Sequence, residues 1–264
     1  MLLSIENLSV SYRDDAGVVK PAARDVTFSL DRAEALGLVG ESGSGKSSVA
    51  LSVPRLLPSP PAFYPKGKIF FEGENILEMK PSRLREIRGR KIGVIFQDPM
   101  GSLSPLWRIG DQLVEAVRLH TDISKAAARE HALKWLSKVS LPDPECVARA
   151  YPHELSGGMQ QRVMTAMALF LEPDLIIADE PTTALDVTVQ KEILSLMNKL
   201  RGASTALLII SHDLGVISSV STKIAVMKDG QVVETRDDIS NFFACPNHPY
   251  SRQLVEEARK MSLG

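Results

Sequence analysis

A glycine-rich stretch near the N-terminus has the spacing GxxxxGK[ST], with the sequence GESGSGKS from Gly40 to Ser47. Glycines let backbone N–H groups curl around phosphate oxygens without Cβ clashes, and a helix N-terminus adds positive dipole. The lysine of such a loop, here Lys46, reaches the β- and γ-phosphates of a nucleotide, and the serine hydroxyl ligates Mg²⁺. The candidate nucleotide-binding residues are Gly40, Glu41, Ser42, Gly43, Ser44, Gly45, Lys46, Ser47 and Ser48.

The competing interpretation of this stretch is a glycine-rich turn before a helix. An apolar run from Ala35 to Val39 precedes it, and a helical pattern from Ser47 to Pro54 follows it. Because strand, loop and helix in this order are the context that phosphate binding requires, the sequence favours a nucleotide site.

Two acids, Asp179 and Glu180, end a second apolar run that begins at Leu175. In nucleotide-hydrolysing proteins with a phosphate loop, an aspartate at this position holds Mg²⁺ through the metal's water shell. The next acid can polarise the attacking water as general base. Two acids at a strand end are common by themselves, but together with the upstream loop they predict Asp179 as a metal-binding residue and Glu180 as a catalytic one.

The segment from Leu155 to Arg162, LSGGMQQR, resembles the LSGGQ signature of ABC ATPases, with Met159 interrupting the strict string. A serine hydroxyl, bare glycine N–H groups and the helix dipole would form a second phosphate cradle. The resemblance implies that this cradle faces ATP bound to the opposite subunit. Its candidate residues are Ser156, Gly157, Gly158 and Gln160. A plain helix N-cap is the alternative, which the position upstream of the acidic strand disfavours.

Four further positions match motifs of the same family. The resemblance implies that Tyr12 stacks on adenine, although a strand-edge tyrosine is the alternative. It implies that Gln97 touches Mg²⁺ and the attacking water and links the core to a helical insertion. The Ala184-Leu185-Asp186 motif would contact the partner subunit, with Asp186 near its nucleotide. His212 would hydrogen-bond the γ-phosphate and, with Gln97 and Glu180, complete the catalytic set.

The resemblance therefore implies an ATPase that uses ATP and Mg²⁺, with Ser47, Gln97 and Asp179 as the metal-binding residues. Two chains would bury two nucleotides head to tail, and ATP would stabilise the closed dimer. Hydrolysis would remove the γ-phosphate that the opposing signature binds, so that the dimer opens. A separate permease would convert this cycle into transport.

Three segments resemble the importer ATPases for oligopeptides, dipeptides and nickel or metal chelates. They are the FQDPM-x-SL-x-P segment at 96–105, the YPHELSGGMQQR segment at 151–162 and the PNHPYSR segment at 246–252. Gly101 and Ser104 depart from the commonest residues of the first segment, with no evident consequence. Longer members carry a cysteine-rich iron–sulfur motif; only Cys245 lies near this C-terminus, so we expect no iron–sulfur cluster. The competing interpretation of this C-terminal segment is a plain solvated extension.

The resemblance also implies the partners: a second ABC ATPase subunit, which is a paralogue or the chain itself, two transmembrane permease subunits and, indirectly, an extracytoplasmic substrate-binding protein. The chain would then lie peripherally on the cytoplasmic face of the inner membrane. Peptide and nickel cargo remain open at this point, because the cargo is recognised by proteins other than this chain.

The alternation of strand and helix patterns predicts an α/β fold with a largely parallel sheet. The resemblance adds a RecA-like P-loop NTPase core, an N-terminal antiparallel β-subdomain and an inserted α-helical subdomain. We expect the ATP-binding core at 1–97 and 157–235, the helical subdomain at 98–156 and a short extension at 236–264. Residues 57–67 are expected to form a proline-rich loop, and 109–139 has a helical pattern.

Composition excludes several other classes of protein. The chain has 264 residues, a net charge of −1 and 24% charged residues, so no basic footprint predicts nucleic-acid binding. The N-terminus lacks the pattern of a signal peptide, and no apolar stretch is long enough to span a bilayer. The basic run from Lys80 to Lys91 fits a solvated helical face better than a phosphate patch. Cys146 and Cys245 fit reduced thiols.

Two rival functions remain. A translation or DNA-repair ABC ATPase would carry a second cassette or a long coiled coil, neither of which is visible in the sequence. A non-catalytic docking module would have lost Lys46, Glu180 or His212, and all three are present.

Overall fold

The computed structural model describes residues 1–183 and 185–262, which divide into two compact units. The first comprises Met1–Leu84 and Ala206–Gly264, and the second comprises Arg85–Thr205. The two residues at the C-terminal end of the first unit, Leu263 and Gly264, lie outside the described part. None of the helices in the described ranges is both long enough and apolar enough to cross a bilayer.

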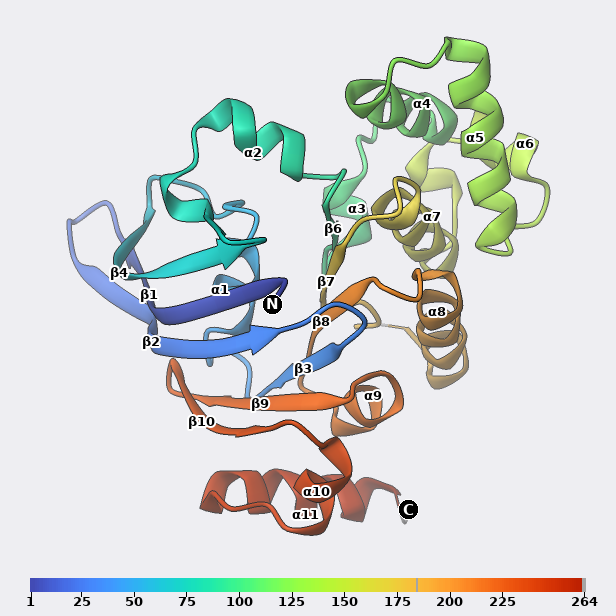
Figure 1. Cartoon of the computed structure of the whole chain (residues 1–264). Coiled ribbons are helices and arrows are strands. Elements are labelled where there is room, and N and C mark those ends of the chain that lie inside the picture. The colour runs from blue at the N-terminus through green and yellow to red at the C-terminus, as the bar shows by residue number, and fades with distance from the viewer. Residues whose placement is uncertain (184, 263–264) are drawn as a thin grey trace. The chain divides into compact units, whose positions relative to one another are not determined.

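The first unit contains two layers of strands (Figure 1). Its elements are β1 (Leu3–Arg13), β2 (Val19–Leu30), β3 (Ala35–Val39), α1 (Lys46–Ser52), β4 (Ala62–Phe71), β5 (Glu74–Asn75), the 3₁₀ turn η1 (Ile76–Glu78), α2 (Pro81–Ile87, which ends in the second unit), β8 (Ala206–Ser211), α9 (Leu214–Val220), β9 (Lys223–Lys228), β10 (Gln231–Arg236), α10 (Ile239–Ala244) and α11 (Pro249–Ser262).

The second unit holds most of the helices (Figure 1). Its elements are β6 (Ile92–Ile95), α3 (Pro99–Ser102), α4 (Ile109–His120), α5 (Lys125–Lys138), α6 (Pro144–Arg149), the 3₁₀ turn η2 (Pro152–Glu154), α7 (Gly157–Leu169), β7 (Leu175–Asp179) and α8 (Val187–Leu200).

Both units contain parallel strand pairs. In the first, β3 lies between β8 and β9 and runs parallel to both, while β10 pairs antiparallel with β9. In the second, β6 and β7 are parallel. All five residues of β3 are buried, as expected for a strand covered on both faces. The predicted parallel α/β core is thus confirmed. Asp229 and Gly230 form the turn of the hairpin between β9 and β10.

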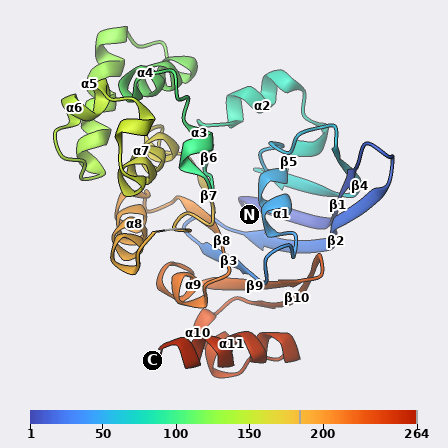
Figure 2. The same cartoon turned by 180° about the vertical axis from the view of Figure 1, so that it is seen from behind.

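An antiparallel sheet in the order β2-β1-β4-β5 forms the predicted N-terminal β-subdomain. Leu3, Ile5, Leu8 and Val10 of β1 are buried, because alternate side chains of a strand share one face. Helix α1 packs on β1 and β2 (Figure 2). Because α1 begins at Lys46, the end of the phosphate loop lies against this sheet.

The prediction of a loop over 57–67 is wrong from Ala62 onward. Ala62 and Phe63 pair with Tyr12 and Ser11, so β4 begins eight residues before Phe70, the first of its residues that pairs with β5. Pro65 is tolerated because β5 pairs only with the last two residues of β4, which leaves the strand an edge at the proline.

The C-terminal segment is more than a solvated extension. Phe242 of α10 and Tyr250 and Val255 of α11 are 0%, 3% and 2% exposed, so both helices pack onto the first unit. The helical pattern over 109–139 is divided in two, since Ser124 caps α5 by accepting a hydrogen bond from the backbone N–H of Ala127 at 3.2 Å.

Candidate functional site

The phosphate loop connects β3 to α1 in the first unit. Lys46, the first residue of α1, is only 4% exposed. Its ammonium group donates hydrogen bonds to the backbone carbonyls of Gly40 and Glu41, both at 2.8 Å, and to the Ser44 hydroxyl at 3.4 Å. The loop therefore curls around the lysine, as a cradle for a phosphate must.

Two glycines of the loop are required by their surroundings. Gly40 and Gly45 have φ values of +150° and +96°. A Cβ on Gly40 would lie 2.1 Å from the backbone oxygen of Met227, and one on Gly45 would lie 2.1 Å from that of Ala22. The chain therefore passes so close to β9 and β2 that only glycine fits at these two points.

Tyr12, at the end of β1, is linked to the same helix. Its hydroxyl and that of Ser48 are 3.0 Å apart and form a hydrogen bond. The predicted adenine-stacking residue and a predicted nucleotide-binding residue are thus brought together within the first unit.

His212 follows β8, also in the first unit, and is exposed. The next residue, Asp213, caps α9 by accepting hydrogen bonds from the backbone N–H groups of Gly215 and Val216. Its own N–H donates to the buried Ser211 hydroxyl at 3.0 Å. The backbone on either side of His212 is therefore fixed, while its ring is accessible.

The second unit places Glu180 beside Gln97. Asp179 is 4% exposed at the end of β7, and Glu180 follows it with a φ of +44°. The Glu180 carboxylate accepts hydrogen bonds from the Gln97 amide at 3.2 Å and from the Thr183 hydroxyl at 2.8 Å. Two of the three predicted catalytic residues are therefore in direct contact.

The signature segment begins α7. Ser156 is its N-cap, and the hydroxyl oxygen accepts a hydrogen bond from the backbone N–H of Met159 at 3.4 Å. Ser156 and Gly157 are exposed, and Gly158 is half-buried. A helix N-terminus that presents accessible glycine N–H groups is suited to an anion.

The side chain of Gln160 makes its hydrogen bonds within its own chain. Its side chain is 6% exposed, and its amide donates to the backbone carbonyls of Pro152 and Leu155 at 2.8 and 3.0 Å. A buried amide committed to two carbonyls of its own chain holds the loop before α7 in place. Sequence spacing alone places Gln160 near the cradle but does not show on which side of the helix it points.

Asp186 caps α8, because its carboxylate accepts hydrogen bonds from the backbone N–H groups of Thr188 and Val189, both at 3.0 Å. It is exposed. The first residue of its motif, Ala184, lies outside the described residues.

Two features were not predicted from the sequence. A cavity of about 740 Å³ opens on the second unit beside the exposed Leu106 (83% exposed) and Trp107 (48% exposed). Its lining residues are Leu106, Trp107, Arg108, Asp111, Val114, Glu115, Arg118, Leu119, Lys125 and Tyr151. The second feature is a hydrogen bond from the Glu41 backbone to Tyr250 of α11. The helical spacing of Tyr250, Leu254 and Ala258 is the one signal that could have placed α11 against the core.

Comparison with known proteins fits these motifs. The ABC transporter family model matches residues 23–183. The oligopeptide transport ATP-binding protein OppD of Bacillus subtilis (strain 168) is 46% identical over 255 residues, which cover 96% of this chain and 71% of that protein. The dipeptide transport ATP-binding protein DppD of the same organism is 44% identical over 265 residues, covering 99% of this chain and 78% of that protein.

A solved structure described as a dimeric, post-hydrolysis state of the ATP-binding cassette MJ0796, bound to ADP and Pi, has a TM-score of 0.79. It is 27% identical and covers 89% of this chain and 98% of its own. The fold, the motifs and these relatives agree, and the chain belongs to the ABC transporter family as an ATP-binding, ATP-hydrolysing cassette.

Proposed function

We propose that this chain is the ATP-hydrolysing subunit of an importer that takes up oligopeptides or dipeptides through a separate permease. The observation that carries the proposal is the phosphate loop curled around a buried Lys46, in a chain 46% identical to an oligopeptide transport ATP-binding protein. The names of the relatives favour peptide over nickel as cargo.

The loop fits the triphosphate of ATP. Lys46 is positioned inside the loop by the backbone carbonyls of Gly40 and Glu41, and the close backbone contacts at Gly40 and Gly45 admit only glycine. Tyr12 would stack on the adenine, at a place fixed by its bond to Ser48. The remaining ATP contacts that we assign are Gly40, Glu41, Ser42, Gly43, Ser44, Gly45 and Ser47.

We assign Mg²⁺ to the Ser47 hydroxyl, the Gln97 side chain and Asp179. All three side chains offer oxygen atoms, the ligand type that Mg²⁺ prefers. When bound, the ion would neutralise charge on the β- and γ-phosphates.

Hydrolysis would rest on Glu180 as the base that accepts a proton from the attacking water. Gln97 and Thr183 hold its carboxylate, and so define the direction in which the second oxygen can act. His212 would donate a hydrogen bond to the γ-phosphate.

A second cassette would complete each site. We propose that Ser156, Gly157 and Gly158 bind the γ-phosphate of ATP held by the partner subunit, and that Asp186 lies at the same interface. The accessible α7 N-terminus supports this proposal, as does the dimeric state of the solved relative. The partner is a paralogue or a second copy of this chain.

A permease helix would dock at the cavity beside Leu106 and Trp107. Large apolar side chains exposed next to a cavity mark an interaction surface. We expect the double variant Leu106→Asp/Trp107→Asp to bind ATP normally but to separate from the permease during purification from detergent. The matched control is Ile123→Asp, at an exposed apolar residue outside the cavity lining. Retention of the permease by the double variant would contradict the docking site.

The parts of the chain would divide this work. We propose 1–97 and 157–235 as the ATP-binding core, 98–156 as the helical subdomain and 236–264 as a C-terminal extension. Helices α4, α5 and α6 pack on one another, which supports the second of these parts (Figure 2). The chain would act at the cytoplasmic face of the inner membrane, with an extracytoplasmic binding protein delivering cargo. We propose neither an iron–sulfur cluster nor a nucleic-acid partner.

The test of function is uptake in a strain of the source organism that lacks this chain. We expect uptake of radiolabelled di- and oligopeptides to be lost, and to return with the wild-type chain but not with Lys46→Ala. Unchanged peptide uptake, or a loss confined to radioactive nickel, would overturn the peptide assignment.

A further inference from the structure

Tyr250 contacts the beginning of the phosphate loop. Its hydroxyl oxygen accepts a hydrogen bond from the backbone N–H of Glu41 at 2.9 Å, and the side chain is 3% exposed. The two residues are far apart in sequence, but both belong to the first compact unit. The tyrosine reaches the loop from the second residue of α11.

A single peptide group joins this contact to Lys46. The Gly40–Glu41 peptide donates its N–H to Tyr250, and its C=O accepts from the Lys46 ammonium at 2.8 Å. A peptide group is planar and rigid, so fixing its N–H also fixes the direction of its carbonyl. Hydrogen bonds in series through one peptide also polarise and strengthen one another. The tyrosine hydroxyl thus acts on the lysine through one rigid unit.

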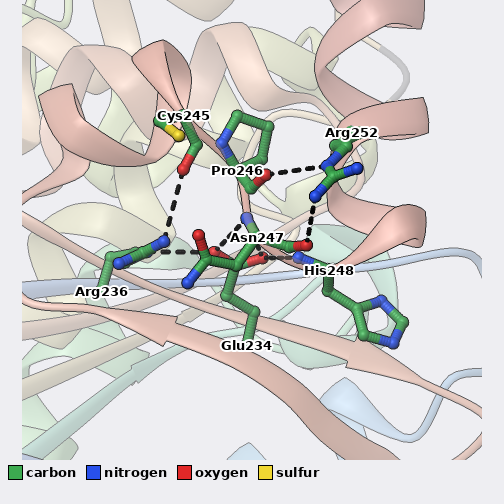
Figure 3. Close-up of polar contacts among 7 residues, drawn as sticks. All are labelled: Glu234, Arg236, Cys245, Pro246, Asn247, His248 and Arg252. Carbon is green, nitrogen blue, oxygen red and sulfur yellow. Dashed lines mark hydrogen bonds and ion pairs between the residues drawn. The ribbon is translucent and has the colours of Figure 1, made fainter.

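The place of Tyr250 is set by a buried carboxylate on β10. Glu234 is 8% exposed and accepts hydrogen bonds from the backbone N–H groups of Asn247 and His248, at 2.9 and 2.8 Å (Figure 3). Arg236 and Arg252 bind the neighbouring carbonyls of Cys245, Pro246 and Asn247 (Figure 3). These contacts fix the turn that starts α11, and with it the tyrosine.

A lysine ammonium also lies close to the Tyr250 ring. The Lys228 ammonium lies 4.8 Å from the centroid of the Tyr250 ring. Burial raises the pKa of Tyr250, so the hydroxyl stays neutral at physiological pH. A neutral hydroxyl has a lone pair to accept from Glu41 and a proton of its own to donate.

We propose that Tyr250 is a positioning residue of the nucleotide site: its hydroxyl orients the Gly40–Glu41 peptide that holds Lys46, and Glu234 positions Tyr250. The C-terminal helix is then a part of the ATP site, and ATP affinity depends on it. This inference rests on the proposed ATPase function and extends it to a segment outside all the nucleotide-binding motifs.

The first test is Tyr250→Phe in the full chain, which removes one oxygen. We expect the Kd for Mg-ATP, measured by calorimetry, to rise about 2- to 10-fold, as for the loss of one hydrogen bond. The kcat at saturating ATP should stay within about twofold, because no group that touches the reacting atoms has changed. Tyr64→Phe, at a half-buried tyrosine on β4, is the matched control and should leave the Kd unchanged.

A second readout needs no nucleotide. Hydrogen exchange of the Glu41 amide, followed by NMR, should be faster in Tyr250→Phe than in wild type and unchanged in Tyr64→Phe. If wild type binds no ATP, the proposed function fails, while this exchange measurement still decides the role of Tyr250. An unchanged Kd together with unchanged Glu41 exchange overturns the inference.

The link to Glu234 is tested by a double-mutant cycle. Because Glu234 acts through Tyr250, Glu234→Gln should raise the Kd in the same direction, and adding it to Tyr250→Phe should produce little further change. Independent, multiplying effects would contradict that link. Should Tyr250→Phe melt well below wild type, Glu234→Gln decides the inference: faster Glu41 exchange supports it, and wild-type exchange overturns it.

Discussion

At the scale of single residues, Glu180 is the group on which hydrolysis depends in this account. Its carboxylate is held by Gln97 and Thr183, and its backbone has the positive φ of a residue fixed at the end of β7. A glutamine at this position keeps the shape but cannot accept the proton of the attacking water.

We therefore expect Glu180→Gln to reduce ATP turnover by about 10²- to 10⁴-fold while ATP binding is retained. The variant should accumulate as a closed, ATP-bound dimer with its partner cassette. Phosphate release and size-exclusion chromatography with ATP measure the two effects. The control is Glu130→Gln, at an exposed glutamate of α5. Unchanged turnover in Glu180→Gln would remove Glu180 from the role of base.

Gly45 and Gly43 provide a matched pair within the loop. Both have positive φ, but a Cβ on Gly45 would meet the Ala22 carbonyl at 2.1 Å, whereas one on Gly43 would meet nothing within 4 Å. An alanine in this region of φ costs about 1–2 kcal/mol, and the clash adds to that cost only at Gly45. Gly45→Ala should therefore lower the free energy of unfolding in urea more than Gly43→Ala. Equal losses would show that the close approach to β2 does not constrain the loop.

At the scale of elements, Gln160 holds the turn that leads into α7. Truncation would leave the carbonyls of Pro152 and Leu155 without their shared donor and loosen the N-terminus of the helix. We expect Gln160→Ala to reduce turnover at saturating ATP several-fold, with the Kd of the isolated chain for ATP unchanged. Turnover would change without a change in Kd because the cradle at the start of α7 would bind the nucleotide held by the partner subunit. A changed Kd with unchanged turnover would place Gln160 in the chain's own ATP site.

The turn before α11 should respond to acid through Glu234. Burial by itself would raise the pKa of this carboxyl, but the backbone N–H groups of Asn247 and His248, with Arg236, together lower it. A group whose folded pKa is lowered contributes stability above its unfolded pKa, near about 4.3, and loses it as the pH falls through the folded value.

Thermal unfolding of wild type and Glu234→Gln should therefore differ most at neutral pH. The difference between the two melting temperatures should shrink as the pH falls below about 4, where the wild-type carboxyl takes up its proton. A difference that stays constant from neutral pH to that range would show that the charge of Glu234 does not hold the turn.

The local sequence pattern was sufficient to predict those elements whose side chains alternate regularly between buried and exposed, or are all buried. The strand β3 follows from its fully apolar run, and the parallel core follows from the alternation of strand and helix patterns. β4 was misjudged between Ala62 and Gly67, because pairing with β1 overrides the turn preference of its prolines. Helix α11 shows the opposite case. Its apolar spacing is visible in the sequence, but nothing in the sequence shows that the helix contacts the phosphate loop.

In the candidate site too, some features could be predicted from the sequence and others could not. The motifs give the identity of Lys46, Asp179 and Glu180, because the chemistry requires those residue types at those places. They do not give the direction of Gln160 or the contact of Tyr250, since both depend on which side of a helix meets a neighbour far along the chain.

At the scale of the whole molecule, the chain is an ATP-binding cassette of a transporter family. None of its described helices is suited to cross a bilayer, and it belongs to a family of transporters. We propose that separate permease chains carry the cargo, and we assign to them the surface at the exposed apolar side chains of Leu106 and Trp107.

Whether this ATPase drives a separate permease can be decided by affinity purification of the tagged chain from detergent-solubilised membranes, followed by mass spectrometry. We expect two permease chains and a cassette subunit, either a related ATPase or a second copy of this chain, to co-purify with it. Recovery of the chain alone, or with ribosomal or DNA-bound proteins, would leave the ATPase in place and contradict its role in transport.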